Sequence, residues 1–125
     1  MIRILVLVVT LSPFAFYAWR DTVAHFRLRK PGWKENVIHL VLAIQQVALV
    51  IGAFRGSAPR VVLAGAGVAI AGAIDEWGFH RGLPAEESDI HAKAHFALFG
   101  FAMVALVMAL FSSWDSAFAV LRGSS

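Results

Sequence analysis

Four long apolar segments, separated by short polar ones, follow one another along the chain. The first runs from Ile4 to Trp19 and passes into the polar stretch RDTVAHFRLRK, and the others cover 37–54, 61–74 and 94–111. Such runs are typical of helices that cross a membrane. The third is short, because a helix over 61–74 is only about 21 Å long and the hydrocarbon core is about 30 Å thick, so the span must continue into DEWGFH.

Turn residues set the expected helix boundaries. Pro31 and Gly32 end the first helix, RGSAPR is too short for anything but an antiparallel hairpin, and Pro84 suits the start of the fourth helix. The sequence therefore predicts an all-α fold, an integral membrane antiparallel four-helix bundle with up-down-up-down topology. A single transmembrane domain is expected to occupy 1–125, with spans at about 3–29, 35–54, 61–80 and 85–111 and a tail over 112–125.

Composition agrees with this prediction and narrows the chemistry. Hydrophobic residues make up 59% of the chain, and the mean hydropathy is +0.72, which favours contact with a lipid bilayer. With no cysteine, disulfides and thiolate metal sites are excluded, so a bound metal must rest on His, Asp, Glu or water. The net charge of +3 and the absence of phosphate-loop motifs argue against a nucleic-acid partner. The small-residue stretch AGAGVAIAGA predicts close helix packing, and a homodimer through that face is one expectation.

Metal-binding and proton-binding side chains collect at one end of the predicted bundle. The antiparallel order brings together the end of the first helix, the start of the second, the end of the third and the start of the fourth. This end holds every histidine and every acidic residue except Asp115: His25, His39, His80, His91, His95, Asp21, Glu35, Asp75, Glu76, Glu86, Glu87 and Asp89. A solvated rim would not sort histidine and carboxylate so completely.

Spacing within each helix sharpens this observation. Each predicted helix carries two such residues four positions apart, on one face and one turn from each other. The inner layer, nearer the apolar runs, comprises Asp21, His39, Glu76 and His95. The outer layer comprises His25, Glu35, His80 and His91. These ligands suit zinc, iron or manganese, so we predict two divalent transition metal ions per chain, with Asp75 and Glu87 as substitute ligands or supports. We call these ten residues the His/carboxylate cluster.

Each pair also has a simpler interpretation. Asp21 and His25 could form an ordinary ion pair within one helix, and Asp75 and Glu76 could pair with Arg20, Arg81 or Lys93. A neutral histidine inside an apolar run could bond a neighbouring helix. The occurrence of matched pairs on all four helices at one depth favours a shared metal site.

The expected ligand arrangement resembles that of the dimetal four-helix bundles of the ferritin-like and designed carboxylate kinds, which also collect Glu and His from four helices. Those bundles use Glu-x-x-His pairs, whereas DTVAH, ENVIH, EWGFH and HAKAH all have a four-residue step. The patterns HAKAH and ENVIH are also similar to the histidine motifs of membrane hydroxylases and desaturases, which are larger and richer in histidine. The resemblance covers ligand geometry only.

Three functions are compatible with this pattern. The first is a membrane metalloprotein with a dinuclear site, a metal-dependent oxidoreductase or hydrolase acting on a lipid, a quinone or another membrane-borne substrate, with Glu87 or Glu86 as general base. The second is a non-enzymatic module that binds, senses or transports metal ions. The third is a haem-b bundle with His39 and His95 as axial ligands, which would not need so many carboxylates.

The distribution of lysine and arginine predicts the orientation. The His/carboxylate end carries Arg20, Arg27, Arg29, Lys30, Lys34, Arg81 and Lys93, and the opposite end carries Arg3, Arg55, Arg60 and Arg122. Loops rich in lysine and arginine tend to stay in the cytoplasm. We therefore expect this end of the bundle to face the cytoplasm, and both termini to lie on the outer side of a cell (inner) membrane.

Overall fold

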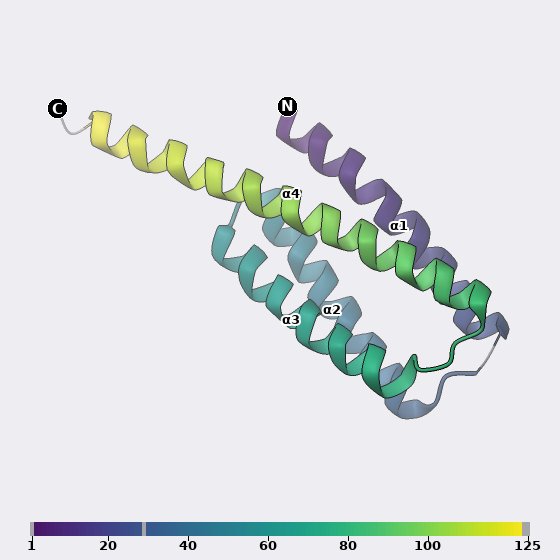
Figure 1. Ribbon diagram of the computed structural model, residues 1–125. Coiled ribbons are helices and arrows are strands. Elements are labelled where there is room, and N and C mark those ends of the chain that lie inside the picture. The colour runs from purple at the N-terminus through teal and green to yellow at the C-terminus, as the bar shows by residue number, and fades with distance from the viewer. Residues whose placement is uncertain (1, 29, 124–125) are drawn as a thin grey trace.

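The computed structural model describes residues 2–28 and 30–123, and the side chains of 2–28 and 30–112. It contains the helices α1 (Ile2–Leu28), α2 (Trp33–Arg55), α3 (Ala58–Phe79) and α4 (Ala85–Gly123), with no strand among the described residues. The helices alternate in direction, and α1 lies beside α4 while α2 lies beside α3 (Figure 1). The prediction of an all-α, four-helix fold is confirmed.

All four helices are long and apolar enough to cross a membrane, with α4 counted as far as Ser112. Their outward surfaces are apolar as well: Leu63 and Phe96 are among the large apolar side chains that lie mostly exposed. A bilayer would cover such surfaces favourably. Three tryptophans, Trp19, Trp33 and Trp77, are exposed near the His/carboxylate end, where an aromatic belt would meet the membrane interface.

A tight connection joins α2 to α3, as the short RGSAPR segment predicts. Gly56 adopts the left-handed conformation (φ 68°) that ends many helices, and the Gly56 and Ser57 amides donate to the carbonyls of Ala53 and Gly52 at 3.0 Å each. Pro59 then occupies the first turn of α3, where its missing amide proton costs nothing. This turn holds α2 and α3 together as a hairpin.

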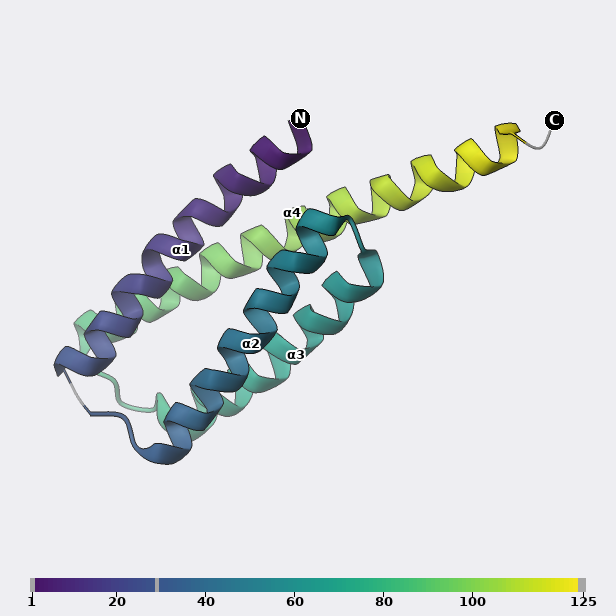
Figure 2. The same cartoon turned by 180° about the vertical axis from the view of Figure 1, so that it is seen from behind.

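The last helix is longer than the expected span. Helix α4 continues as far as Gly123, into the segment expected to be a tail, and extends past the other helices (Figure 2). The positions Arg29, Asp115 and Arg122, to which the sequence assigned an end of the bundle, lie outside the described side chains.

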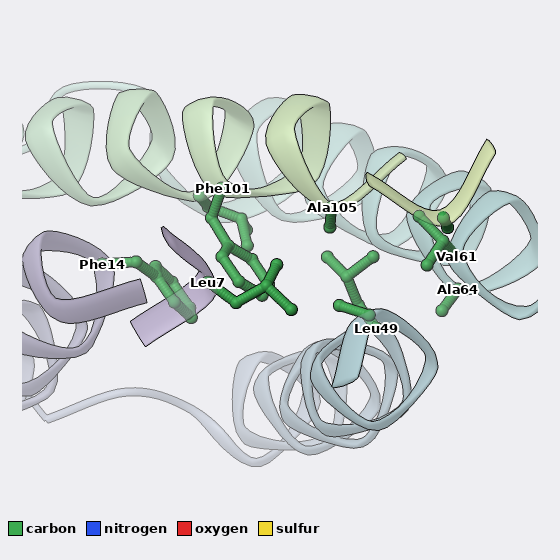
Figure 3. Packing of buried hydrophobic residues seen from close by; sticks show 10 residues of the cluster. Leu7, Phe14, Leu49, Val61, Ala64, Phe101 and Ala105 are labelled. Atoms are coloured by element: carbon green, nitrogen blue, oxygen red, sulfur yellow. The ribbon is translucent and has the colours of Figure 1, made fainter. Parts of the chain in front are cut away.

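The apolar core lies at the end of the bundle away from the His/carboxylate cluster. All four helices contribute to it: Leu7, Phe14, Leu49, Ala53, Val61, Ala64, Leu98, Phe101, Ala105 and Ala109. Phe101 of α4 lies near Leu7 and Phe14 of α1. Leu49 of α2 lies nearer to Val61 and Ala64 of α3 (Figure 3). Beyond the core, Arg3 donates to the Phe54 carbonyl and, at 3.4 Å, to Ser112 Oγ, which ties α1 to the ends of the other helices.

Candidate metal centre

The His/carboxylate cluster is buried between the four helix ends. Six of its side chains are at most 7% exposed: His25, Glu35, Asp75, His80, Glu87 and His91. Removing so many ionisable groups from water is costly unless they neutralise one another or bind a cation. Their burial therefore requires close partners, and the partners are other members of the cluster.

A first group of ligand atoms comes from three helices. It comprises His25 at the end of α1, Glu35 and His39 on α2, and His80 at the end of α3. Glu35 Oε1 lies 3.8, 4.0 and 3.7 Å from the Nε2 atoms of His25, His39 and His80, respectively. Ligands of a tetrahedral zinc ion lie about 3.3–3.6 Å from one another, so these atoms need to move little to share one ion.

The two nitrogens of His25 have different partners. Nδ1 lies 3.0 Å from the Asp21 carbonyl oxygen, which can only accept, so Nδ1 carries the proton of this hydrogen bond. Nε2 then presents its lone pair toward His80 Nε2, 3.0 Å away. A backbone carbonyl behind the ring is a common support for metal-binding histidines. A proton on His80 Nε2 makes this contact a hydrogen bond, and a metal ion bound by both nitrogens would replace that proton.

A second group joins α3 and α4 and comprises Glu76, His91 and His95. His91 Nδ1 lies 3.1 Å from Asp21 Oδ2, to which it donates. His91 Nε2 points the other way, lies 3.4 Å from Glu76 Oε2 and makes no hydrogen bond. The His91 and His95 rings are neighbours, with centroids 4.2 Å apart. A carboxylate behind a histidine whose other nitrogen is buried without a hydrogen bond is the arrangement of a supported metal ligand.

Asp75 lies between the two groups. Its Oδ1 is 3.3 Å from His39 Nε2, and its Oδ2 is 3.2 Å from His80 Nδ1. With His80 and His91 it forms a further set of ligand atoms close enough to hold an ion. Successive residues of a helix point about 100° apart, which explains why Asp75 is buried in the bundle while the side chain of its neighbour Glu76 is 52% exposed.

The grouping in space cuts across the two predicted layers. The first group combines His39 of the inner layer with three residues of the outer layer, and the second combines Glu76 and His95 with the outer-layer His91. Residues predicted to lie at the same depth in the bundle are therefore not the ones that come together in space. Asp21, expected in the inner layer, lies behind His91 and His25 instead of in either group.

The two acidic residues expected to serve as a general base occupy different environments. Glu87 is fully buried, and its Oε1 lies 3.4 Å from His25 Nδ1, on the side of the ring away from His80. Glu86 is exposed in the first turn of α4. The position of Glu87 suits a support for His25 better than a direct ligand.

The basic residues considered as alternative partners lie elsewhere in the described structure. Lys93 pairs with Asp89 one turn away on the exposed face of α4. The guanidinium of Arg20 lies 5.9 Å from the centre of the Phe16 ring, and Arg81 is exposed. The ion-pair partners that the described structure gives for Asp75 are His39 and His80. Asp75 is therefore paired with histidines and not with the arginines or the lysine that the sequence offered.

A cavity of about 640 Å³ extends from the cluster toward the apolar core. Its polar end includes His25, His39, Asp75, His91 and His95, and Phe14 and Leu49 of the core line its far end. A second cavity of about 530 Å³ reaches the cluster from another side and is lined by Glu76, His80, His91 and His95 together with Phe96 and Phe99. The second group of ligands borders both cavities.

The sequence did not identify the residues that make room for the larger cavity. Gly65 and Gly72 were expected to allow close packing, but a side-chain carbon at Gly65 would meet no atom within 4 Å, and at Gly72 only Leu42, 4.0 Å away. Both glycines line the cavity. Their spacing of seven residues, two helical turns on one face, was the available signal.

Comparison with known protein families, with curated proteins and with solved structures found no match to this chain.

Proposed function

We propose that this protein is an integral membrane metalloprotein that binds two divalent transition metal ions in the His/carboxylate cluster and acts on a membrane-borne substrate. One observation carries the proposal: four buried helix ends direct histidine and carboxylate atoms into groups whose members all lie within 4.8 Å of one another. Zinc, iron and manganese accept such mixed ligands.

The two groups suit different tasks. The first offers four ligands, His25, Glu35, His39 and His80, which would complete the coordination of a tetrahedral ion. The second offers three, Glu76, His91 and His95, and borders both cavities. Catalytic metal sites typically combine three protein ligands with one open position. The first group therefore supports a structural ion and the second a reactive one.

The open position would support either of two reactions. A zinc ion there would activate water for hydrolysis, and an iron ion there would activate oxygen for an oxidation. For hydrolysis, we propose an acidic residue of the α4 start, Glu87 or Glu86, as general base. The burial of Glu87 beside His25 supports a positioning role in either reaction. The metal found in the purified protein decides between the reactions.

The alternatives have less support. Ion transport needs a polar path across the bundle, whereas the cavity ends among apolar side chains such as Phe14 and Leu49. A haem held by His39 and His95 would need space for its ring between them. Instead, the five imidazoles contact one another in a series, from His25 to His39 and His80 and on through His91 to His95, with neighbouring centroids 4.2–5.9 Å apart.

Elemental analysis of the detergent-purified protein tests the proposal. We expect about two equivalents of zinc, iron or manganese per chain, about one in His39→Ala and about one in His95→Ala, because each variant removes a ligand of one group. Asp89→Asn is the matched control, since Asp89 is an exposed acidic residue of the same end. Wild-type protein that folds but holds no stoichiometric metal, or variants that keep both equivalents, would refute the proposal.

A further inference from the structure

We propose that the larger cavity is the binding site for a single long acyl chain, whose oxygen-bearing head group meets the metal ion of the second group. This inference rests on the proposed function and adds the substrate class. It follows from the two unlike ends of the cavity, its dimensions, its openings and the glycines that line it.

The lining changes from polar to apolar along the helices. At one end are Asp21, His91 and His95, and at the other are Phe14, Leu49 and Ala102, with Ala69 and Gly72 among the residues between. A purely polar ligand would leave the apolar end unfilled, and a purely apolar ligand would bury the cluster without partners. An amphiphile with one polar head satisfies both ends.

The dimensions fit a lipid chain. From His39 to Leu49 on α2 the cavity extends about 15 Å, half of a hydrocarbon core of about 30 Å. Its volume of about 640 Å³ is large enough for one acyl chain of that length.

Exposed lining residues show that the cavity reaches the surface of the bundle. Phe26 of α1, Trp77 of α3 and Phe99 of α4 line it and are mostly exposed. The helices around it are candidate membrane spans, so their exposed apolar surfaces would face acyl chains. A lipid chain could therefore move from the bilayer into the cavity between the α1/α4 pair and the α2/α3 pair without crossing water.

Gly65 provides a position at which the far end of the cavity can be closed. A side-chain carbon there would meet no atom within 4 Å, and Gly65 precedes the metal-facing Glu76 by eleven residues, or about 16 Å of helix. A fully extended chain advances about 1.2 Å per bond, so a sixteen-carbon chain with its head at the metal reaches Gly65 and an eight-carbon chain ends about 8 Å short.

The experiment measures binding of radiolabelled palmitate and octanoate to the metal-loaded protein in phosphatidylcholine nanodiscs. The variant Gly65→Phe fills the far end of the cavity. The matched control is Ala66→Phe, which adds a similar bulk at the next position, on an exposed face that does not line the cavity. Metal content and monodispersity are measured first for each protein, so that loss of the metal or of the fold is distinguished from loss of the lipid site.

We expect wild-type protein to bind palmitate in a one-to-one ratio and Gly65→Phe to bind it at least tenfold more weakly, with octanoate binding and metal content unchanged. Ala66→Phe should match wild type, and His95→Ala should weaken both fatty acids by removing a metal ligand. Equal palmitate binding by Gly65→Phe and wild type, or no palmitate binding by metal-loaded wild type, would overturn the inference. Absence of metal from the wild type would instead refute the proposed function.

Discussion

Two histidines of the cluster are oriented by hydrogen bonds to Asp21. His25 donates one ring proton to the Asp21 carbonyl, and His91 donates to the Asp21 carboxylate, so a single residue of α1 fixes two rings from two helices. Because each ring then directs its other nitrogen into the cluster, Asp21 determines the direction of two candidate ligands without belonging to either group. Supports of this kind commonly change metal affinity by 10- to 100-fold.

We therefore expect Asp21→Ala to lower metal affinity by about 10- to 100-fold, measured by competition with a chromophoric chelator, because His91 loses the acceptor of its Nδ1 proton. Asp21→Asn, which keeps an acceptor oxygen, should recover part of the affinity. The control Asp89→Asn should bind as wild type does. If Asp21→Ala keeps wild-type affinity, Asp21 has no positioning role.

At the residue scale, the sequence identified the cluster but not the partners within it. The four-residue steps located candidate ligands on each helix because helical periodicity is local. Asp21 contacts His25 one turn away, as the spacing indicated, but it also contacts His91, 70 residues further along the chain, and no local pattern relates Asp21 to His91. Asp75 was expected as a substitute ligand or support, and its place between the two groups depends on how α2 and α3 meet.

Helix packing at the turn between α2 and α3 depends on one glycine. A side-chain carbon at Gly52 would come within 3.0 Å of Arg60 Cβ and 3.2 Å of the Val61 backbone nitrogen. Backbone atoms cannot rotate away as a flexible side chain can. The two helices therefore approach each other closely at Gly52, whereas the small-residue stretch of α3 leaves open space at Gly65.

We expect Gly52→Leu to destabilise the bundle by about 1–3 kcal/mol, the usual cost of excess volume in a packed interface. The matched variant Gly65→Leu should leave stability nearly unchanged, because the added side chain enters the cavity. Denaturation in increasing sodium dodecyl sulfate, followed by tryptophan fluorescence, would measure both. A larger effect at Gly65 than at Gly52 would contradict this account of the helix interface.

The sequence predicted four helices, since apolar length and turn residues are local signals, but it did not predict that α4 continues to Gly123. It did not predict which helices pack together. The closest partner of α1 is α4, its most distant neighbour in sequence, and this pairing creates the cavity beside the α2/α3 hairpin. Some small residues of α3 therefore pack against α2 and others line the cavity, and the sequence alone did not distinguish the two groups.

On the scale of the whole molecule, the bundle has two unlike ends. An apolar core closes one end, the His/carboxylate cluster occupies the other, and the larger cavity connects them. A membrane protein with this division can hold charged ligands near the interface while a lipid chain occupies the hydrophobic interior. The sidedness of the cluster then determines which aqueous compartment supplies metal ions and water.

We expect the cluster to face the cytoplasm, because the loops at its end carry the larger number of lysines and arginines. The chain has no cysteine, so single cysteines at Arg81 and at Ser57 report the two sides without background. A membrane-impermeant maleimide applied to intact cells should label Ser57→Cys and leave Arg81→Cys unlabelled until the membrane is opened. The reverse labelling would place the cluster outside.

Anomalous diffraction from crystals of metal-loaded protein would show whether the His/carboxylate cluster holds metal ions. We expect two anomalous peaks. One would lie about 2.0–2.2 Å from the nearest ligand atoms of His25, Glu35, His39 and His80, and the other at the same distance from Glu76, His91 and His95. No peak within the cluster, or peaks only at exposed carboxylates such as Asp89, would contradict this expectation.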